Sequence, residues 1–130
     1  MTKGQELTAT LRKSFRISTR SRITRDGLDL RVEMLDAIRN AVYYPGYYGA
    51  EKTAIYSEAI GAVQSYEKHV DGYRIDGVVR YQIESMSPWQ FAGFIGEMVD
   101  AGVTNCGQGE LFFNGKRASA QAWLAAKQAA

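Results

Sequence analysis

The chain contains one cysteine, Cys106, and one histidine, His69, and this scarcity limits how the fold can be held together. A lone cysteine cannot form an internal disulfide, and one Cys with one His cannot supply the usual ligands of a structural zinc site. The fold must therefore rest on a hydrophobic core. Because 45% of the 130 residues are hydrophobic, we expect a single domain over residues 1–130, with no metal and no cofactor. The basic N-terminal segment, residues 1–25, is the candidate appendage of this domain.

The sequence also lacks the features of a membrane or exported protein. No stretch approaches the roughly 18 consecutive apolar residues of a membrane span, and the N-terminus has no apolar signal-peptide core. We therefore expect a soluble, cytoplasmic protein with no membrane partner.

Apolar spacing predicts three helices in the first half of the chain. A short helix is expected near the N-terminus, followed by an extended basic strand up to residue 25. The next helix, with Asp26 as its N-cap, should end by Tyr44, because the residue before a proline disfavours helical geometry. Pro45-Gly46 suits the centre of a type II turn, after which a helix from about Ala50 to Tyr66 completes an αα-hairpin. The inner face of the middle helix is expected at Leu28, Val32, Leu35, Ile38 and Val42.

Residues 70–84 contain two Asp-Gly pairs, and each suits a two-residue hairpin turn. A turn at Asp76-Gly77 would divide the apolar side chains between two faces, whereas one strand over residues 73–84 keeps them on one face. We therefore predict a single long strand. Ser87-Pro88 predicts a helix start and Gly102 its end.

After Gly102 the sequence predicts a hairpin and a last helix. The hairpin should turn across residues 107–109, and the helix should begin at about Arg117 or Ser119, with Trp123 as its anchor. Together the elements predict an α+β fold, in which a three- to four-stranded, mainly antiparallel sheet carries helices on one face and includes the αα-hairpin.

Positive charge is concentrated at the start of the chain. Residues 1–25 carry seven basic residues and one acid, a net charge of +6, whereas the remaining 105 residues carry −4. The arginines alternate with serines and threonines, which can donate to phosphate oxygens. This pattern predicts a site for an anionic partner, and the alternative is pairing with the chain's own acids. The predicted site residues are Arg12, Lys13, Arg16, Arg20, Arg22 and Arg25.

The segment YYPGYYG, residues 43–49, predicts a second contact region. Neighbouring tyrosines cannot all point into the core from a helix end and a turn, so some rings must be exposed. Tyrosine is enriched at protein interfaces, and we predict a protein contact patch, with packing of the αα-hairpin as the alternative. Base stacking is less favoured because only Lys52 is near in sequence. The predicted patch consists of Tyr43, Tyr44, Tyr47 and Tyr48.

Catalytic groups are scarce. His69 as a base would need an acid such as Asp71 or Asp76 and a nucleophile such as Cys106. Its place near a helix end favours an exposed histidine instead, and a lone cysteine is usually a buried apolar residue. The acids at 71, 76, 97 and 100 fit turn and solvent-facing positions, and the Gly-X-Gly at 107–109 lacks the helix of an anion loop. We assign no catalytic residue and favour a protein that is not an enzyme.

Three functional hypotheses remain open. The favoured one is a small non-enzymatic binding protein, an accessory or inhibitory factor of the kind carried by phages and mobile elements, which occupies a partner surface with its tyrosines and basic segment. The second is a nucleic-acid-binding module that contacts phosphates through the N-terminal arginines. The third is a small-ligand binder or enzyme with a pocket lined by tyrosines and by Arg74 and Arg80.

Overall fold

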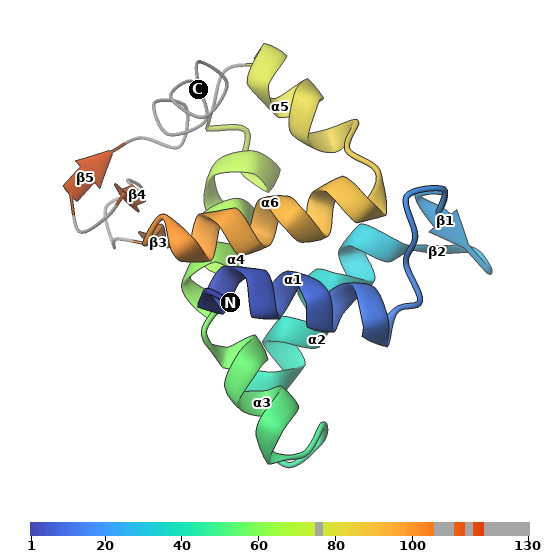
Figure 1. Cartoon of the computed structure of the whole chain (residues 1–130). Coiled ribbons are helices and arrows are strands. Elements are labelled where there is room, and N and C mark those ends of the chain that lie inside the picture. Colours follow the sequence, from blue (N-terminus) through green and yellow to red (C-terminus); the bar gives the residue numbers. More distant parts are fainter. Residues whose placement is uncertain (75–76, 106–110, 114–115, 119–130) are drawn as a thin grey trace.

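The computed structural model describes residues 1–74, 77–105, 111–113 and 116–118, and this part of the chain is mostly helical (Figure 1). The helical elements are α1 (Lys3–Ser14), α2 (Leu30–Tyr43), α3 (Ala50–Ser57), α4 (Ile60–Tyr66), the π-helical turn η1 (Glu67–Asp71), α5 (Gly77–Glu84) and α6 (Pro88–Asp100). The strands are β1 (Thr24–Arg25), β2 (Leu28–Asp29), β3 (Thr104–Asn105), β4 (Leu111–Phe113) and β5 (Lys116–Ala118). β1 pairs with β2, and β4 pairs with β3 and β5, always antiparallel.

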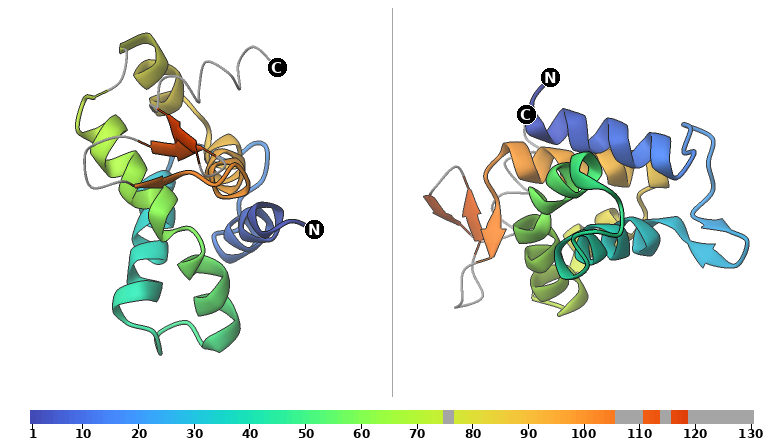
Figure 2. Two further views of the ribbon diagram at one scale, coloured as in Figure 1. Left: turned by 90° about the vertical axis from the view of Figure 1, so that its left-hand side faces the viewer. Right: turned by 90° about the horizontal axis from the view of Figure 1, so that it is seen from below.

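The predicted α+β fold, with a three- to four-stranded sheet covered on one face by helices, is wrong. Each strand has only two or three residues, and the helices pack on one another rather than on a sheet. Nearly all buried apolar side chains among the described residues belong to helices, and they form one core cluster. The αα-hairpin of α2 and α3 forms one end of the molecule, at the bottom of Figure 1 and of the left-hand view of Figure 2.

α1 lies antiparallel along α6, and small residues let the two backbones meet (Figures 1 and 2). A Cβ on Gly4 would clash with the carbonyl oxygen of Gly96, and a Cβ on Gly96 would clash with Thr8 and with the Gly4 backbone. The Thr8 hydroxyl donates to the carbonyl oxygen of Ala92 at 2.9 Å, and the Gly4 N–H donates to Asp100 at 2.8 Å. The helix pair therefore depends on glycine at both crossing positions.

The prediction for α6 is confirmed at both ends. Ser87 is the N-cap, its hydroxyl accepts from the N–H of Gln90 at 3.2 Å, and Pro88 is the first helical residue. Gly102 follows the helix with a φ of 73°, the left-handed geometry that favours glycine. The signals were reliable here because cap, proline and terminal glycine all agree.

The start of α2 differs from the prediction. Asp26 is not its N-cap: Asp26 and Gly27 both have positive φ and form the two-residue turn of the β1–β2 hairpin. Asp29 caps the helix instead, by accepting from the N–H of Arg31 at 2.9 Å. The buried face is rotated accordingly, because Leu28 and Val32 are about half exposed. The buried residues of α2 are Leu30, Met34, Leu35, Ala37, Ile38 and Ala41.

The αα-hairpin is present, with two differences in detail. The N–H of Tyr47 donates to the carbonyl oxygen of Tyr44 at 2.9 Å, which closes the predicted β-turn. Gly46 has no positive φ, so the turn is not type II; proline before it fits type I equally well. The helix predicted from Ala50 to Tyr66 is broken between α3 and α4, at a point without proline or glycine to signal it.

The long strand predicted over residues 73–84 is also wrong, because residues 77–84 form α5. Arg80 pairs with Glu84 at 2.8 Å, the i,i+4 spacing that supports a helix. An alternating apolar pattern over so few residues fits the two-residue period of a strand and the 3.6-residue period of a helix equally well. Among the side chains described on α5, only Ile83 is fully buried.

Two further predictions concern the ends of the chain. The basic segment is not an extended strand: it leaves α1 as a loop, and only β1 is strand. The hairpin after Gly102 is confirmed by the pairing of β3 with β4. Residues 116–118 form β5 rather than the start of a helix, and Trp123 lies outside the described residues.

Candidate partner-binding surface

The tyrosine turn, residues 43–48, joins α2 to α3 and is held in one conformation by hydrogen bonds. The N–H of Tyr44 donates to the carbonyl oxygen of Asn40 at 2.8 Å, and the Thr53 hydroxyl donates to the carbonyl oxygen of Pro45 at 2.9 Å. With the β-turn bond, these contacts fix the backbone from the last turn of α2 to the first turn of α3. The side chains are therefore presented on an ordered support.

Three of the four rings lie largely in solvent. Tyr43 and Tyr44 are each 64% exposed, and Tyr47 is 74% exposed. Tyr48 differs, because it is half-buried and packs edge-to-face against Tyr56 with ring centroids 5.6 Å apart. Tyr47 in turn meets Tyr48 edge-to-face at 4.8 Å. Tyr48 therefore anchors the turn, and the other three rings form the exposed patch.

The basic loop, residues 15–25, begins with a left-handed residue. Arg16 has a φ of 51°, its N–H donates to the carbonyl oxygen of Lys13, and the N–H of Ile17 donates to that of Arg12. This pair of bonds is a Schellman motif, in which glycine is the usual residue at the position of Arg16. Ile17 is buried and ties the loop to the core. The backbone of an arginine in this left-handed conformation is strained, and such strain often marks a functional position.

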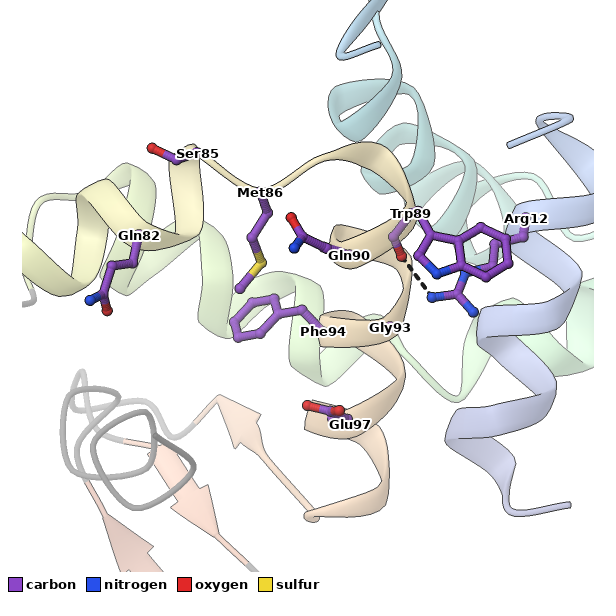
Figure 3. A pocket seen from close by; sticks show the side chains of 9 residues that line it. All are labelled: Arg12, Gln82, Ser85, Met86, Trp89, Gln90, Gly93, Phe94 and Glu97. Atoms are coloured by element: carbon purple, nitrogen blue, oxygen red, sulfur yellow. Dashed lines mark hydrogen bonds between the residues drawn. The ribbon is translucent and has the colours of Figure 1, made fainter. Parts of the chain in front are cut away.

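Two of the six predicted anion-binding cations serve the fold instead. The Arg25 guanidinium donates to the carbonyl oxygens of Phe15 at 2.6 Å and Arg16 at 2.9 Å, which closes the basic loop. Arg12 lies 3.6 Å over the Trp89 ring and donates to the carbonyl oxygen of Trp89 at 2.8 Å. Figure 3 shows this guanidinium beside the indole, at one edge of a pocket of about 490 Å³.

Burial lowers the pKa of Arg12, and its Nε has no hydrogen-bond partner among the described residues. Arg12 and Arg25 are therefore poor candidates for a partner's anion, and their assignment as contact residues is not supported by where their side chains point. Lys13, Arg16, Arg20 and Arg22 are exposed, and none of them lies in an ion pair with a carboxylate in the described part of the chain.

A groove lies between the basic N-terminal segment and the tyrosine turn, the two regions predicted to contact a partner. It has a volume of about 600 Å³ and runs between the last turn of α1 and the first turn of α3. Lys13 lies on one side of the groove, and Tyr48 and Lys52 lie on the other. The sequence alone does not predict that Lys13 and Tyr48 lie close together, because 35 positions separate them. The tyrosine turn therefore has two lysines beside it rather than one.

The third hypothesis, a pocket lined by tyrosines and by Arg74 and Arg80, stays a prediction, but the tyrosine turn does not contribute to such a pocket. The tyrosine turn and α5 lie at opposite ends of the molecule in Figure 1 and in the left-hand view of Figure 2. Arg80 on α5 pairs with Glu84, and its guanidinium lies 3.5 Å over the Tyr73 ring. Arg80 is therefore occupied locally, and Arg74 is exposed beside it.

His69 is buried, so the prediction of an exposed histidine at a helix end is wrong. It lies in η1, and its pKa is lowered by burial first and then by the charges of Lys68 and Arg74. Its Nε2 and the hydroxyl of Ser65, one turn earlier, have no hydrogen-bond partner among the described residues. Asp76 and Cys106, the other members of the catalytic hypothesis, lie outside the described residues, as does the glycine loop at 107–109.

Within the ranges that the structure describes, no three His, Cys, Asp or Glu side chains gather closely enough to hold a metal ion. Among these same residues, none of the helices has the length and apolar composition needed to cross a bilayer. Comparison with protein-family models, with curated proteins and with solved structures found no match to this chain.

Proposed function

We propose that this chain is a small non-enzymatic binding protein that acts as an accessory or inhibitory factor by covering part of a partner protein. The proposal depends above all on the exposure of Tyr43, Tyr44 and Tyr47 on a hydrogen-bonded turn. Exposed aromatic rings on a rigid backbone lose little conformational entropy on binding, which favours affinity. Such rings are typical anchors of protein interfaces.

The chemistry around the turn indicates the kind of partner. Lys13 and Lys52 border the groove beside Tyr48, and Glu51 is the acidic residue among those that line it. Arg16, Arg20 and Arg22 extend the exposed positive charge beyond the end of α1. We therefore expect the partner to present an apolar centre for the rings and carboxylates at its rim, because complementary charges favour association.

Replacing Tyr43, Tyr44 and Tyr47 together with alanine should reduce recovery of the partner by at least roughly tenfold, since truncating one anchor ring costs about 2 kcal/mol. The measurement is quantitative affinity capture from lysate, followed by binding of the purified partner. Tyr48 is left intact because it supports the turn.

Tyr81→Ala is the matched control, because Tyr81 is 71% exposed on α5, far from the turn. Thermal unfolding of both variants should match wild type. If the triple variant recovers the same proteins in the same amounts as wild type, the tyrosine turn is not the contact surface.

The basic loop favours nucleic acid as a second candidate partner. Arg16, Arg20 and Arg22 are exposed, without a carboxylate partner in the described ranges, and Ser18 and Thr19 between them are exposed as well. Guanidinium and hydroxyl groups in this arrangement suit phosphate oxygens. A loop of this kind would bind with little regard to base sequence.

Under this second candidate, wild type should bind generic DNA or RNA with an affinity that falls steeply with salt. Substituting Arg16→Gly, Arg20→Ser and Arg22→Ser should reduce the salt slope by about 2 to 3, since each lost phosphate contact removes roughly 0.9. Glycine at position 16 relieves the left-handed strain, so the variant should fold well. Lys3→Ser is the control, at the other end of α1. Absence of binding at low salt would exclude this candidate, and fluorescence anisotropy provides the measurement.

A further inference from the structure

His69 is the single histidine of the chain, and it lies in the core, with 3% of its surface exposed. Histidine is the side chain whose ordinary pKa, about 6.5, lies in the range of roughly pH 5 to 8. A change in the fold within this range can therefore be traced to one residue. His69 does not line the groove beside the tyrosine turn, so the inference below is independent of the proposed function.

The burial of His69 is not offset by a hydrogen bond to its Nε2. This nitrogen and the hydroxyl of Ser65, one turn earlier, are both fully buried, and neither has a partner among the described residues. An imidazolium donates from both of its ring nitrogens and carries a full charge, whereas a neutral imidazole has one donor. Burying an unpaired charge costs far more than burying a neutral polar group. A proton on His69 would therefore enter a place with no acceptor for Nε2.

The charges that act on His69 also oppose its protonation. They belong to Lys68, its neighbour on η1, and to Arg74, just after η1, and both are positive. They lower the pKa of His69 further, after burial, which is the larger cause. β3, which packs against α4, has no ionisable residue.

No carboxylate near α4 and η1 offsets these positive charges. Among the described residues, none forms an ion pair with His69. Glu33 on α2, Asp71 on η1 and Glu97 on α6 are at least partly exposed. The other acids are bound elsewhere: Asp36 and Glu67 pair with Arg39, Glu84 pairs with Arg80, and Asp100 accepts from the Gly4 N–H.

The segment that carries His69 is conformationally strained. η1 is a π-helical turn, a rare geometry that is frequent at functional sites, and the N–H of Arg74 donates to the carbonyl oxygen of His69 at 2.9 Å. Tyr73 follows with a φ of 57°, a left-handed backbone that is unusual for a bulky residue. Such strain persists only while the surrounding contacts hold it. Loss of those contacts should therefore open this segment first.

α5 depends on η1 for part of its attachment. The Arg80 Nε donates to the carbonyl oxygen of Val70 at 3.3 Å, and the guanidinium lies 3.5 Å over the Tyr73 ring. Ile83 is the one fully buried side chain among those described on α5. Figure 1 shows α5 at the edge of the molecule, far from the αα-hairpin. Opening of η1 would remove both Arg80 contacts and loosen α5.

We propose that η1 is an acid-sensitive switch, in which protonation of His69 opens residues 67–74 and releases α5 while α1 and α6 stay packed together. The sign follows from the burial of the imidazole. Because the pKa of His69 is lower in the folded state than in the open state, the open state takes up the proton. Stability is full above about pH 6.5 and is lost as the pH falls through this value toward the folded pKa. One proton changes the opening equilibrium by at most roughly tenfold per pH unit.

The test is amide hydrogen exchange of the full chain, measured by NMR between about pH 7.5 and about pH 5 and expressed as protection factors, which remove the intrinsic effect of pH. In wild type, protection of residues 67–74 and of α5 should fall roughly tenfold over this range, ahead of α1 and α6. The imidazole resonances of His69 should titrate below about pH 6.5.

His69→Gln and His69→Phe are the matched variants, one polar and one apolar, and neither side chain titrates. Each variant is compared with itself across the pH range, so a constant loss of stability does not affect the result. Both should keep the same protection at the two ends of the range. The proposal is overturned if the variants lose protection as wild type does, if α1 and α6 lose protection together with η1, or if the His69 imidazole titrates at or above about pH 6.5.

Discussion

Gly96→Ala should lower the free energy of unfolding by about 3 kcal/mol, the upper end of the usual range for overpacking. The new methyl group would clash with the Thr8 side chain and the Gly4 backbone where α1 crosses α6. Backbone atoms of a second helix cannot move aside as a side-chain end can. The helices would have to separate, and chemical denaturation monitored by circular dichroism would measure the loss.

The chain offers two matched controls for this substitution. A Cβ at Gly93 would meet one side-chain atom, Nη2 of Arg12 at 3.2 Å, and no backbone atom, so Gly93→Ala should cost less than Gly96→Ala. A Cβ at Gly46 meets nothing within 4 Å, and Gly46→Ala should be close to neutral. If all three variants unfold at the same denaturant concentration, close α1–α6 contact does not stabilise the fold.

Phe91→Ala should be at least as damaging, with an expected loss of about 3–5 kcal/mol. Phe91 is fully buried and its ring meets both Tyr66, at 5.4 Å, and Phe94, at 6.2 Å. Truncation leaves a cavity in the centre of the core and removes the support of Tyr66. Equilibrium unfolding in urea provides the measurement.

Phe91→Leu and Tyr81→Ala are the comparisons for this second prediction. Leucine fills part of the space, so Phe91→Leu should lie between wild type and Phe91→Ala. Tyr81 is 71% exposed, so its truncation removes an aromatic ring without opening a cavity. An alanine variant at position 91 as stable as the one at position 81 would show that the ring adds nothing to the core.

The sequence predicted the helices best where independent local signals agreed. For α6, the cap at Ser87, the proline after it and Gly102 at the end point to the same boundaries. Residues 77–84 carry no cap or terminal signal, and an alternating apolar pattern over eight residues is compatible with a helix as well as with a strand. Asp26-Gly27 fits two local structures, because an Asp-Gly dipeptide is as typical of a hairpin turn as an aspartate is of a helix cap, and the chain adopts the hairpin turn.

The candidate surface was predictable only in part. The crowding of four tyrosines around Pro45-Gly46 correctly predicted exposed rings, because a steric conflict between neighbouring residues can be recognised from the local sequence. The role of Arg12 was not accessible, since the Trp89 ring that receives its guanidinium is 77 positions away. The proximity of Lys13 to Tyr48 likewise depends on how α1 and α3 pack, which local patterns do not specify.

Arg25 gives the basic loop a property that charge alone does not provide. Its two hydrogen bonds to the carbonyl oxygens of Phe15 and Arg16 join the end of the loop to its beginning, and Ile17 fixes the segment to the core. The guanidinium groups of Arg16, Arg20 and Arg22 therefore start from a backbone of set shape. A partner encounters a fixed spacing of cations, so discrimination among anionic surfaces can depend on geometry as well as on the amount of charge.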